Sequence, residues 1–169
     1  MKKVNFEELI MKFTEIPELV TKQIELSMKK SAMKVRYDAT KKFGEYQPAV
    51  GPYPAWETLS LRTVIEKMDR GAESPQPLIG AYGASQYQEG NRVTKNEIWP
   101  EHLRNTIGIK AEGLNAAVGT DDPLGKWHEY GTEDERIPPR PFLRPALYEN
   151  QDTIKNNVKE AIQNGLKSL

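Results

Sequence analysis

The sequence predicts an α+β fold in which a long N-terminal amphipathic helix and a C-terminal amphipathic helix accompany a small antiparallel β-sheet. Three observations predict it. Apolar residues recur at spacings of three and four near both ends of the chain, two short apolar runs flank a glycine-containing link at 104–119, and runs rich in Pro and Gly separate these segments. The length of 169 residues predicts a single domain over residues 1–169.

The first element is the long N-terminal helix, because one apolar stripe continues through it. Thr14 suits a helix cap and Pro17 a first helical turn, which predicts that residues 5–13 form a separate short helix before a bend. Gly44 is expected to end the long helix. The stripe consists of Ile16, Val20, Ile24, Met28, Ala32, Val35, Ala39 and Phe43.

The middle of the chain has a weaker pattern. Residues 44–57 hold several prolines and aromatic residues, so we expect an ordered connection anchored by aromatic rings. Residues 58–69 are expected to be helical, with Leu61, Val64, Ile65 and Met68 on one face. Residues 70–100 are predicted to be a long irregular insertion or loop, and loops of such length are usually functional or disordered.

The small sheet is expected to include a hairpin near 104–119. Residues 106–110 and 114–118 flank the link Ala111-Glu112-Gly113, a pattern typical of antiparallel pairing. Residues 124–130 are expected to form a single helical turn that packs Trp127 and Tyr130.

A proline-rich arm, residues 137–145, follows and is expected to be extended because proline restricts φ. Its apolar and arginine side chains suit docking either on its own domain or on a neighbouring subunit. A docking motif for a proline-reading domain, through Pro138 and Pro141, is the weaker interpretation because the basic residues are misplaced for it.

The last element is the C-terminal amphipathic helix, with Pro145 in its first turn. Its expected apolar face consists of Leu147, Asn150, Ile154, Val158, Ala161, Ile162 and Leu166.

Composition excludes several classes of function. With no Cys, the chain has no disulfide, thiol nucleophile or Cys-ligated metal, and no run approaches the ~20 apolar residues of a membrane helix. The N-terminus turns acidic where a signal peptide would turn apolar, so we expect a soluble protein. Lys+Arg and Asp+Glu number 24 each, which gives no support for binding nucleic acid. We therefore expect neither membrane binding nor sequence-specific nucleic-acid binding.

The candidate catalytic residues are few. His128 beside Glu129 could move protons or bind metal, but no H-x-x-x-H spacing accompanies the pair. Asp121 and Asp122 suit solvated turns, as do residues 133–135, and the glycines form no phosphate-binding loop. We expect no catalytic residues, cofactor or metal. The alternative is a phage-encoded metal-dependent hydrolase or nuclease that uses His128, Glu129, Asp121 and Asp122. A small regulatory binding module is a third possibility.

Aromatic residues in the expected loops either close a small core or form contact hot spots, and core closure is the favoured interpretation for each. These residues are Tyr46, Tyr53, Trp56, Tyr82, Tyr87, Trp99, Trp127 and Tyr130.

Several motifs then occur in a fixed order. They are Leu103-Arg104-Asn105-Thr106-Ile107, Ala117-Val118-Gly119-Thr120, Trp127-His128-Glu129-Tyr130-Gly131-Thr132 and Ile137-Pro138-Pro139-Arg140-Pro141-Phe142-Leu143-Arg144-Pro145-Ala146-Leu147, before the last helix. This order resembles the neck or minor tail-component family of tailed bacteriophages, also called head-tail joining or tail-completion proteins. The resemblance covers residues 103–166, whereas the N-terminal helix agrees only in kind.

The resemblance implies a structural virion protein of a phage or prophage, not an enzyme. It implies a homo-oligomeric ring in the neck of the virion, with the phage head-tail connector and tail proteins as partners. The isolated chain could be a monomer, and during assembly the protein would lie in the bacterial host cytoplasm. We expect the motif residues to make partner or subunit contacts: Glu129, Tyr130, Gly131, Thr132, Arg140, Pro141, Phe142, Leu143, Arg144 and Pro145.

Overall fold

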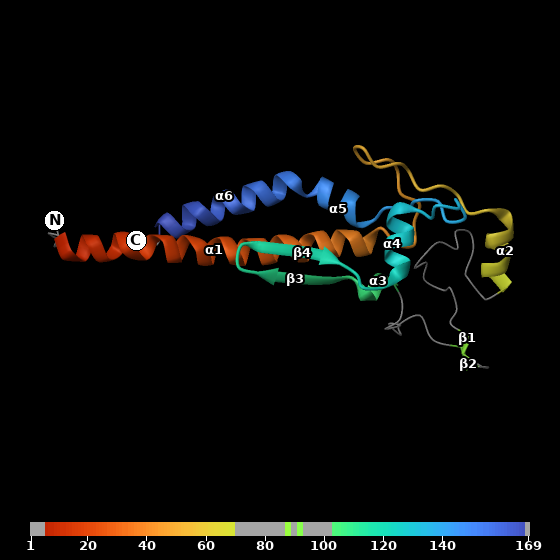
Figure 1. Ribbon diagram of the computed structural model, residues 1–169, viewed down its shortest axis with the longest axis horizontal. Coiled ribbons are helices and arrows are strands. Elements are labelled where there is room, and N and C mark those ends of the chain that lie inside the picture. The colour runs from red at the N-terminus through yellow and green to blue at the C-terminus, as the bar shows by residue number, and fades with distance from the viewer. Residues whose placement is uncertain (1–5, 70–86, 89–90, 93–102, 168–169) are drawn as a thin grey trace. The chain divides into compact units, whose positions relative to one another are not determined.

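The predicted fold class is confirmed by a computed structural model that describes residues 6–69, 87–88, 91–92 and 103–167 (Figure 1). The chain is α+β. A long helix α1 (Phe6–Lys41) comes first, a two-stranded antiparallel sheet of β3 (Gly108–Glu112) and β4 (Asn115–Gly119) follows in the second half, and helix α6 (Gln151–Lys167) comes last. No helix in the described ranges is long and apolar enough to cross a bilayer.

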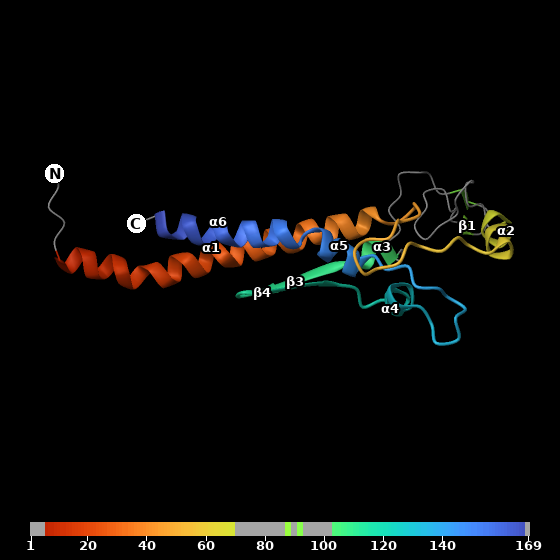
Figure 2. The same cartoon turned by 90° about the horizontal axis from the view of Figure 1, so that it is seen from above.

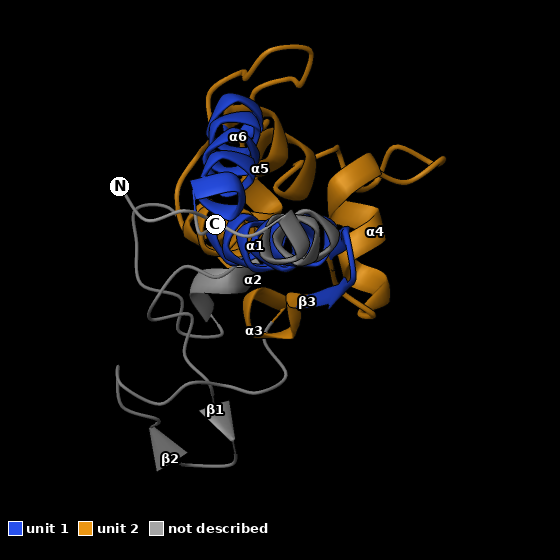
Figure 3. Ribbon diagram, turned by 90° about the vertical axis from the view of Figure 1, so that its left-hand side faces the viewer, with its two compact units in different colours: residues 1–34, 109–117, 150–169 blue, residues 35–108, 118–149 orange. Residues whose placement is uncertain are grey.

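The contacts group the chain into two compact units, each assembled from segments far apart in the sequence (Figure 3). Unit 1 comprises residues 1–34, 109–117 and 150–169, and unit 2 comprises residues 35–108 and 118–149. Neither unit is a contiguous piece of chain, so the segments of each must come together from distant parts of the sequence.

Helix α1 runs without a break through Pro17, so the predicted separate helix over residues 5–13 is wrong. Proline inside a helix removes one backbone hydrogen bond, and here the helix continues on both sides of the missing bond. The predicted apolar stripe is confirmed: its members from Ile16 to Met28 are half-buried, and those from Ala32 to Phe43 are buried. The helix ends at Lys41, and Gly44 follows at φ 97°.

In unit 1, α6 runs alongside α1 in the opposite direction (Figures 1 and 2). Asn157 Nδ2 donates to Ser31 Oγ at 3.2 Å, and Gly165 lies directly against the backbone of Val20. The two helices approach closely because small residues lie at the contact, including the buried Ser31 of α1 and the buried Gly165 of α6.

The C-terminal helix is interrupted, contrary to the prediction of one continuous helix. Helix α5 (Leu143–Glu149) ends before the buried Asn150, and α6 begins after it, with the Ile154 N–H bonded to the Asn150 carbonyl at 2.9 Å. The predicted face therefore divides. Asn150, Ile154, Val158 and Ala161 are buried or half-buried, whereas Leu147, Ile162 and Leu166 are exposed.

The hairpin is confirmed, but its turn lies later than predicted. Gly113 and Leu114 join the strands, and Gly113 has φ 54°, the sign that type II′ turns require at their first central residue. Ala111 and Glu112, predicted in the link, therefore belong to β3. Thr106 is not in a strand, because its hydroxyl bonds to the Leu103 carbonyl and closes the one-turn helix α3 (Leu103–Thr106).

In unit 2 the predicted ordered connection is confirmed. Val50 and Tyr53 form an isolated antiparallel bridge, and the Trp56 N–H bonds to the Gln47 carbonyl at 2.9 Å. Helix α2 (Leu61–Asp69) confirms the short helix. Large buried side chains come from segments distant in the sequence: Phe43, Trp56, Leu103, Ile107 and Phe142.

The predicted insertion over residues 70–100 is described only at two short strands. β1 (Tyr87–Gln88) and β2 (Asn91–Arg92) pair in antiparallel register, Tyr87 with Arg92 and Gln88 with Asn91. The rest of this segment, including Tyr82 and Trp99, lies outside the described residues, as does His102.

Helix α4 (Pro123–Tyr130) has eight residues where a single turn was predicted. Asp122 caps it, accepting from the Leu124 N–H at 2.9 Å. The predicted packing of Trp127 and Tyr130 is wrong: they are 43% and 62% exposed. The inward positions of the helix are held instead by Gly125 and Glu129, which are buried.

Candidate functional site

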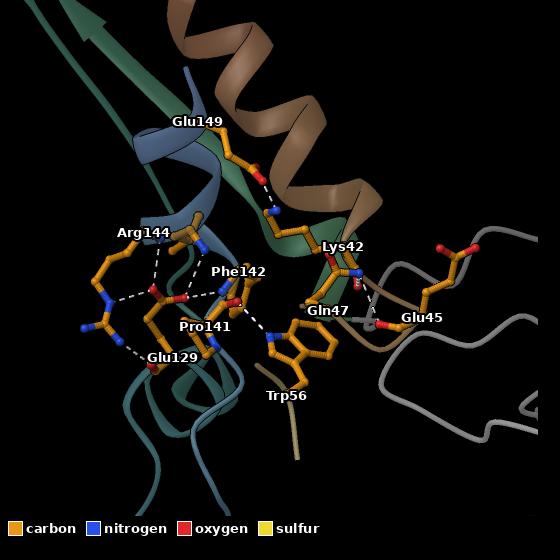
Figure 4. Close-up of polar contacts among 10 residues, drawn as sticks. Lys42, Glu45, Gln47, Trp56, Glu129, Pro141, Phe142, Arg144 and Glu149 are labelled. Carbon is orange, nitrogen blue, oxygen red and sulfur yellow. Dashed lines mark hydrogen bonds and ion pairs between the residues drawn. The ribbon is translucent and has the colours of Figure 1, made fainter. Parts of the chain in front are cut away.

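The motif residues meet in unit 2, where Glu129 of α4 caps the start of α5. Its Oε2 accepts from the N–H groups of Phe142 at 2.8 Å and Leu143 at 2.9 Å, and its Oε1 accepts from the Arg144 N–H at 3.0 Å (Figure 4). The first N–H groups of a helix have no partner inside the helix, and a carboxylate there also opposes the helix dipole. Pro145 comes next and has no N–H to satisfy. One side chain therefore satisfies the start of α5.

The Arg144 side chain also bonds to Glu129 and so adds a second link between α5 and α4. Its Nε donates to Glu129 Oε1 at 2.8 Å, and its Nη2 donates to the Glu129 carbonyl. The guanidinium carbon also lies 4.3 Å from the ring centroid of Tyr130 and 5.2 Å from that of Tyr53. Hydrogen bonds from a planar guanidinium and its stacking on rings fix its orientation, which lysine could not reproduce.

Phe142 is the central apolar anchor. Its side chain is fully buried, and its ring meets that of Phe43 edge to face at a centroid distance of 4.8 Å. The neighbouring Pro141 carbonyl accepts from Trp56 Nε1 at 2.9 Å, so the indole N–H is satisfied although the ring is buried (Figure 4). The arm is thus docked on its own unit, by a core residue and a backbone hydrogen bond.

The arm also departs from its prediction. Residues 138–141 have no regular secondary structure, and α5 already begins at Leu143, so Arg144 and Pro145 are helical. The Glu129 cap explains the early helix start, since it satisfies N–H groups that an extended arm would leave to solvent.

Gly131 and Thr132 shape the loop between α4 and the arm. Gly131 has φ 79° and ψ 179°, a conformation essentially reserved for glycine, so the sharp turn depends on glycine at this position. The Gly131 N–H bonds to the Trp127 carbonyl at 2.7 Å. The Ile137 N–H donates to Thr132 Oγ1, and the Thr132 N–H donates to the Ile137 carbonyl, each at 3.0 Å. These two hydrogen bonds close the loop.

Arg140 is the buried cation of the site. It is 4% exposed, its Nη2 donates to the Glu57 carbonyl at 3.1 Å, and its backbone N–H bonds to the His128 carbonyl at 2.6 Å. Burial lowers the pKa of the Arg140 guanidinium from its ordinary value, partly offset by nearby Tyr46 and Glu57. The cation is therefore held by backbone oxygen within the unit.

A further polar contact joins the ends of α1 and α5. The buried Lys42 donates to Glu149 Oε2 at 2.8 Å, and Gln47 Nε2 donates to the Lys42 carbonyl at 3.0 Å (Figure 4). Sequence reasoning did not single out these residues. It noted Phe43, Tyr53 and Trp56 only as apolar or aromatic positions, since nothing local indicates that the 43–56 segment lies beneath the arm.

The predicted contact residues thus divide by burial. Tyr130 is the most exposed of the set, whereas five residues are buried in the unit and act inside it: Glu129, Arg140, Pro141, Phe142 and Pro145. Gly131, Thr132, Leu143 and Arg144 are half-buried.

Two residues of the enzyme alternative, Glu129 and Asp122, act as helix caps in the structure. Both Glu129 oxygens are engaged by N–H groups, and Asp122 caps α4. No group of three or more His, Asp or Glu residues in the described part of the chain could hold a metal ion.

Comparisons with known proteins reveal one distant relative. The chain is 29% identical to an uncharacterized protein of Methanocaldococcus jannaschii over 108 residues, which is 59% of this chain and 79% of that protein. No protein-family model and no solved structure matches the chain.

Proposed function

We propose that this protein is a structural assembly protein of a tailed phage or prophage that acts at the head-tail junction through protein-protein contacts. The proposal rests on the ordered motifs over residues 103–166 and their resemblance to neck and tail-completion proteins. In the virion it would form part of a homo-oligomeric ring between the connector and the tail.

The observation that carries the proposal is the Glu129 cap. The resemblance depends on two motifs separated in sequence, one containing Glu129 and Tyr130, the other containing Phe142 and Arg144. In the structure the two motifs meet, because Glu129 binds the backbone of Phe142 and Arg144 and the Phe142 ring is buried in the core. Motif side chains that hold two helices together suit a protein with a structural role. Both Glu129 oxygens already accept hydrogen bonds, which leaves neither free for acid-base chemistry.

The exposed side chains next to the cap supply the proposed contact surface. Leu124 and Trp127 of α4 are each 43% exposed and Tyr130 is 62% exposed, so α4 presents large side chains to solvent. Trp and Tyr are the residues most enriched at the energetic centres of protein interfaces. We assign the subunit or partner contact to this face of α4, with the buried motif residues positioning it.

The decisive experiment is deletion of the gene in the inducible source phage, with restoration from a plasmid, and negative-stain electron microscopy of the lysate. We expect filled heads separated from tails, or tails with a defective end. Normal infectious particles from the deletion would contradict the proposal.

Variants of the restoring plasmid would test the contact surface. We expect the double variant Trp127→Ala/Tyr130→Ala to fold and yet fail to restore joined particles. Tyr37→Ala is the matched control, because Tyr37 is similarly exposed, at 54%, on a different helix. Full restoration by the double variant would remove the role assigned to α4.

A further inference from the structure

Helix α1 carries a second apolar line in unit 1, separate from the stripe that forms the core. Leu26 and Met33 are 57% and 49% exposed, and the half-buried Leu19 continues the line. A spacing of seven residues is nearly two helical turns, so these side chains lie one above another along the helix. Folding of the chain leaves Leu26 and Met33 about half in water, so the core does not explain the line.

Lysines flank this line on both sides. Lys22 and Lys29 lie on one side of Leu26, and Lys30 lies on the other, each three or four residues away and exposed. Glu18 and Glu25 lie further round the helix, and Glu25 is turned toward Gly113 of the hairpin. Around Leu26 and Met33 the immediate border of the apolar line is therefore basic.

A groove adjoins the same line. It has a volume of about 200 Å³ and opens between α1 and α6, within unit 1. Its wall includes Ser27, whose buried hydroxyl has no hydrogen-bond partner in the structure, although buried hydroxyls normally have one. Leu26, Ser27 and Lys30 of α1 and Glu160 of α6 are among the residues that line it.

We propose that the α1 surface formed by Leu19, Leu26, Met33 and the lysines Lys22, Lys29 and Lys30 docks an acidic amphipathic helix of another protein. Charge decides among the possible occupants. The same surface of a second copy would oppose lysine to lysine, which is repulsive. An amphipathic helix that lays apolar side chains along the line and carboxylates at its borders matches both the shape and the charge. Glu160 lies on the α6 side of the groove and would repel the partner's carboxylates. The carboxylates are therefore expected to lie beside the lysines of α1.

This inference is independent of the proposed function, because a chain with no place in a virion could still dock such a helix. The lysine side chains could instead only shield the apolar line with their methylene groups. An experiment that varies peptide charge separates the two, because shielding predicts no preference for acidic peptides.

The test selects displayed helical peptides, about 20 residues long so that a helix can form, against the full-length chain. Three libraries share randomised apolar positions along one face and differ only in the residues that flank this face, which are Glu, Gln or Lys. We expect the Glu library to be enriched, with saturable binding by fluorescence anisotropy that weakens as salt rises. Equal enrichment of the three libraries, or none, would overturn the proposal.

Two variants locate the binding. Leu26→Gln/Met33→Gln should weaken the selected peptides at least about tenfold, the size expected when hot-spot residues are lost. Lys22→Glu/Lys29→Glu/Lys30→Glu should lose the Glu peptides and bind the same peptides with Lys at the flanks. All of these positions are exposed, so folding should survive, and circular dichroism checks it. Ile162→Gln and Lys155→Glu/Lys159→Glu, at exposed positions of α6, are the matched controls.

Three outcomes would overturn the proposal at this stage. The first is peptide binding that survives the Leu26 and Met33 substitutions. The second is binding of phosphatidylserine-containing vesicles with no binding of the acidic peptides, which would assign the surface to a membrane. The third is self-association removed by the same substitutions, which would assign it to a second copy.

Discussion

The carboxylate of Glu129 and the guanidinium of Arg144 are 2.8 Å apart, and the same carboxylate accepts the Arg144 backbone N–H at 3.0 Å. An acidic residue near the end of one helix thus binds both the side chain and the backbone of a residue in the first turn of another. Glu129 is almost fully buried, whereas the Arg144 side chain is 37% exposed, so the carboxylate is shielded from water and the guanidinium only in part. Removing the carboxylate would leave several donors unsatisfied at once.

Glu129→Ala is therefore expected to lower the free energy of unfolding by about 2–4 kcal/mol, because it removes a helix cap and leaves several N–H donors without a partner. Urea denaturation followed by circular dichroism would measure it. Glu133→Ala, in the exposed loop nearby, is the control and should change stability by no more than about 0.5 kcal/mol. A Glu129→Ala protein as stable as the control would show that the cap contributes nothing.

Gly131→Ala should also destabilise the protein, here through the backbone. At φ 79° an added Cβ is strained, and it would lie 3.1 Å from the Ile137 carbonyl oxygen and 3.2 Å from Pro139. We expect a loss of about 1–3 kcal/mol in urea denaturation. Gly108→Ala is matched to it, because no atom lies within 4 Å of a Cβ there and φ is not positive. A larger loss for Gly108→Ala than for Gly131→Ala would contradict this account.

The acidic loop gives a prediction about pH. The Thr132 side chain, followed by the Arg136 backbone N–H, hydrogen-bonds the Asp134 carboxylate and holds its pKa below the ordinary value of 3.8. A lowered folded pKa adds stability that is present above the unfolded pKa and disappears as pH falls through the folded one. NMR titration should show the low pKa. Thr132→Val should raise it toward 3.8 and Thr132→Ser should keep it low, and identical values in both variants would exclude the hydroxyl as the cause.

Sequence reasoning predicted the elements well and their contacts poorly. The α1 stripe was predictable because a helix repeats its buried face every three or four residues. The positive φ of Gly131 was predictable because a sharp turn between two motifs favours glycine. The Glu129 cap was not, since the adjacent His128 made the pair resemble acid-base chemistry, and nothing local shows that the carboxylate meets N–H groups 13 to 15 residues later.

The exposed aromatic residues show a second limit. Trp127 and Tyr130 carry the same apolar signal as Trp56, yet only Trp56 is buried. The difference lies in what covers each ring. Trp56 is placed beneath the arm by a hydrogen bond to Pro141, 85 residues away in sequence, and periodicity over a short window contains no information on such a distant contact.

Phe142→Ala tests whether the arm is docked within the chain. Because the ring is fully buried against Phe43, truncation should cost about 3–5 kcal/mol of unfolding free energy, from lost burial and the cavity left behind. Tyr130→Ala, on the exposed side of the same site, should cost far less. A Phe142→Ala protein with unchanged stability that fails only in assembly would mean that Phe142 contacts a neighbour instead.

Gly165→Ala is expected to destabilise unit 1, although alanine normally favours a helix by about 1 kcal/mol over glycine. The reason is the close approach of the two helices. A Cβ at Gly165 would lie 2.8 Å from the Cα of Val20, and backbone cannot yield as a flexible side chain can. Asn164→Ala, at the exposed neighbouring position of α6, is the control and should leave stability unchanged or slightly raised.

Hydrogen exchange would localise the effect of Gly165→Ala. Protection should fall in residues 16–34 and in α6, where the two helices meet, because pushing α6 outward exposes the backbone hydrogen bonds of both. Unit 2 should keep its protection around Glu129 and Phe142. Alanine that stabilises α6 at position 165 would show that the helices have room to separate at no cost, and that the contact between Gly165 and Val20 does not limit their approach.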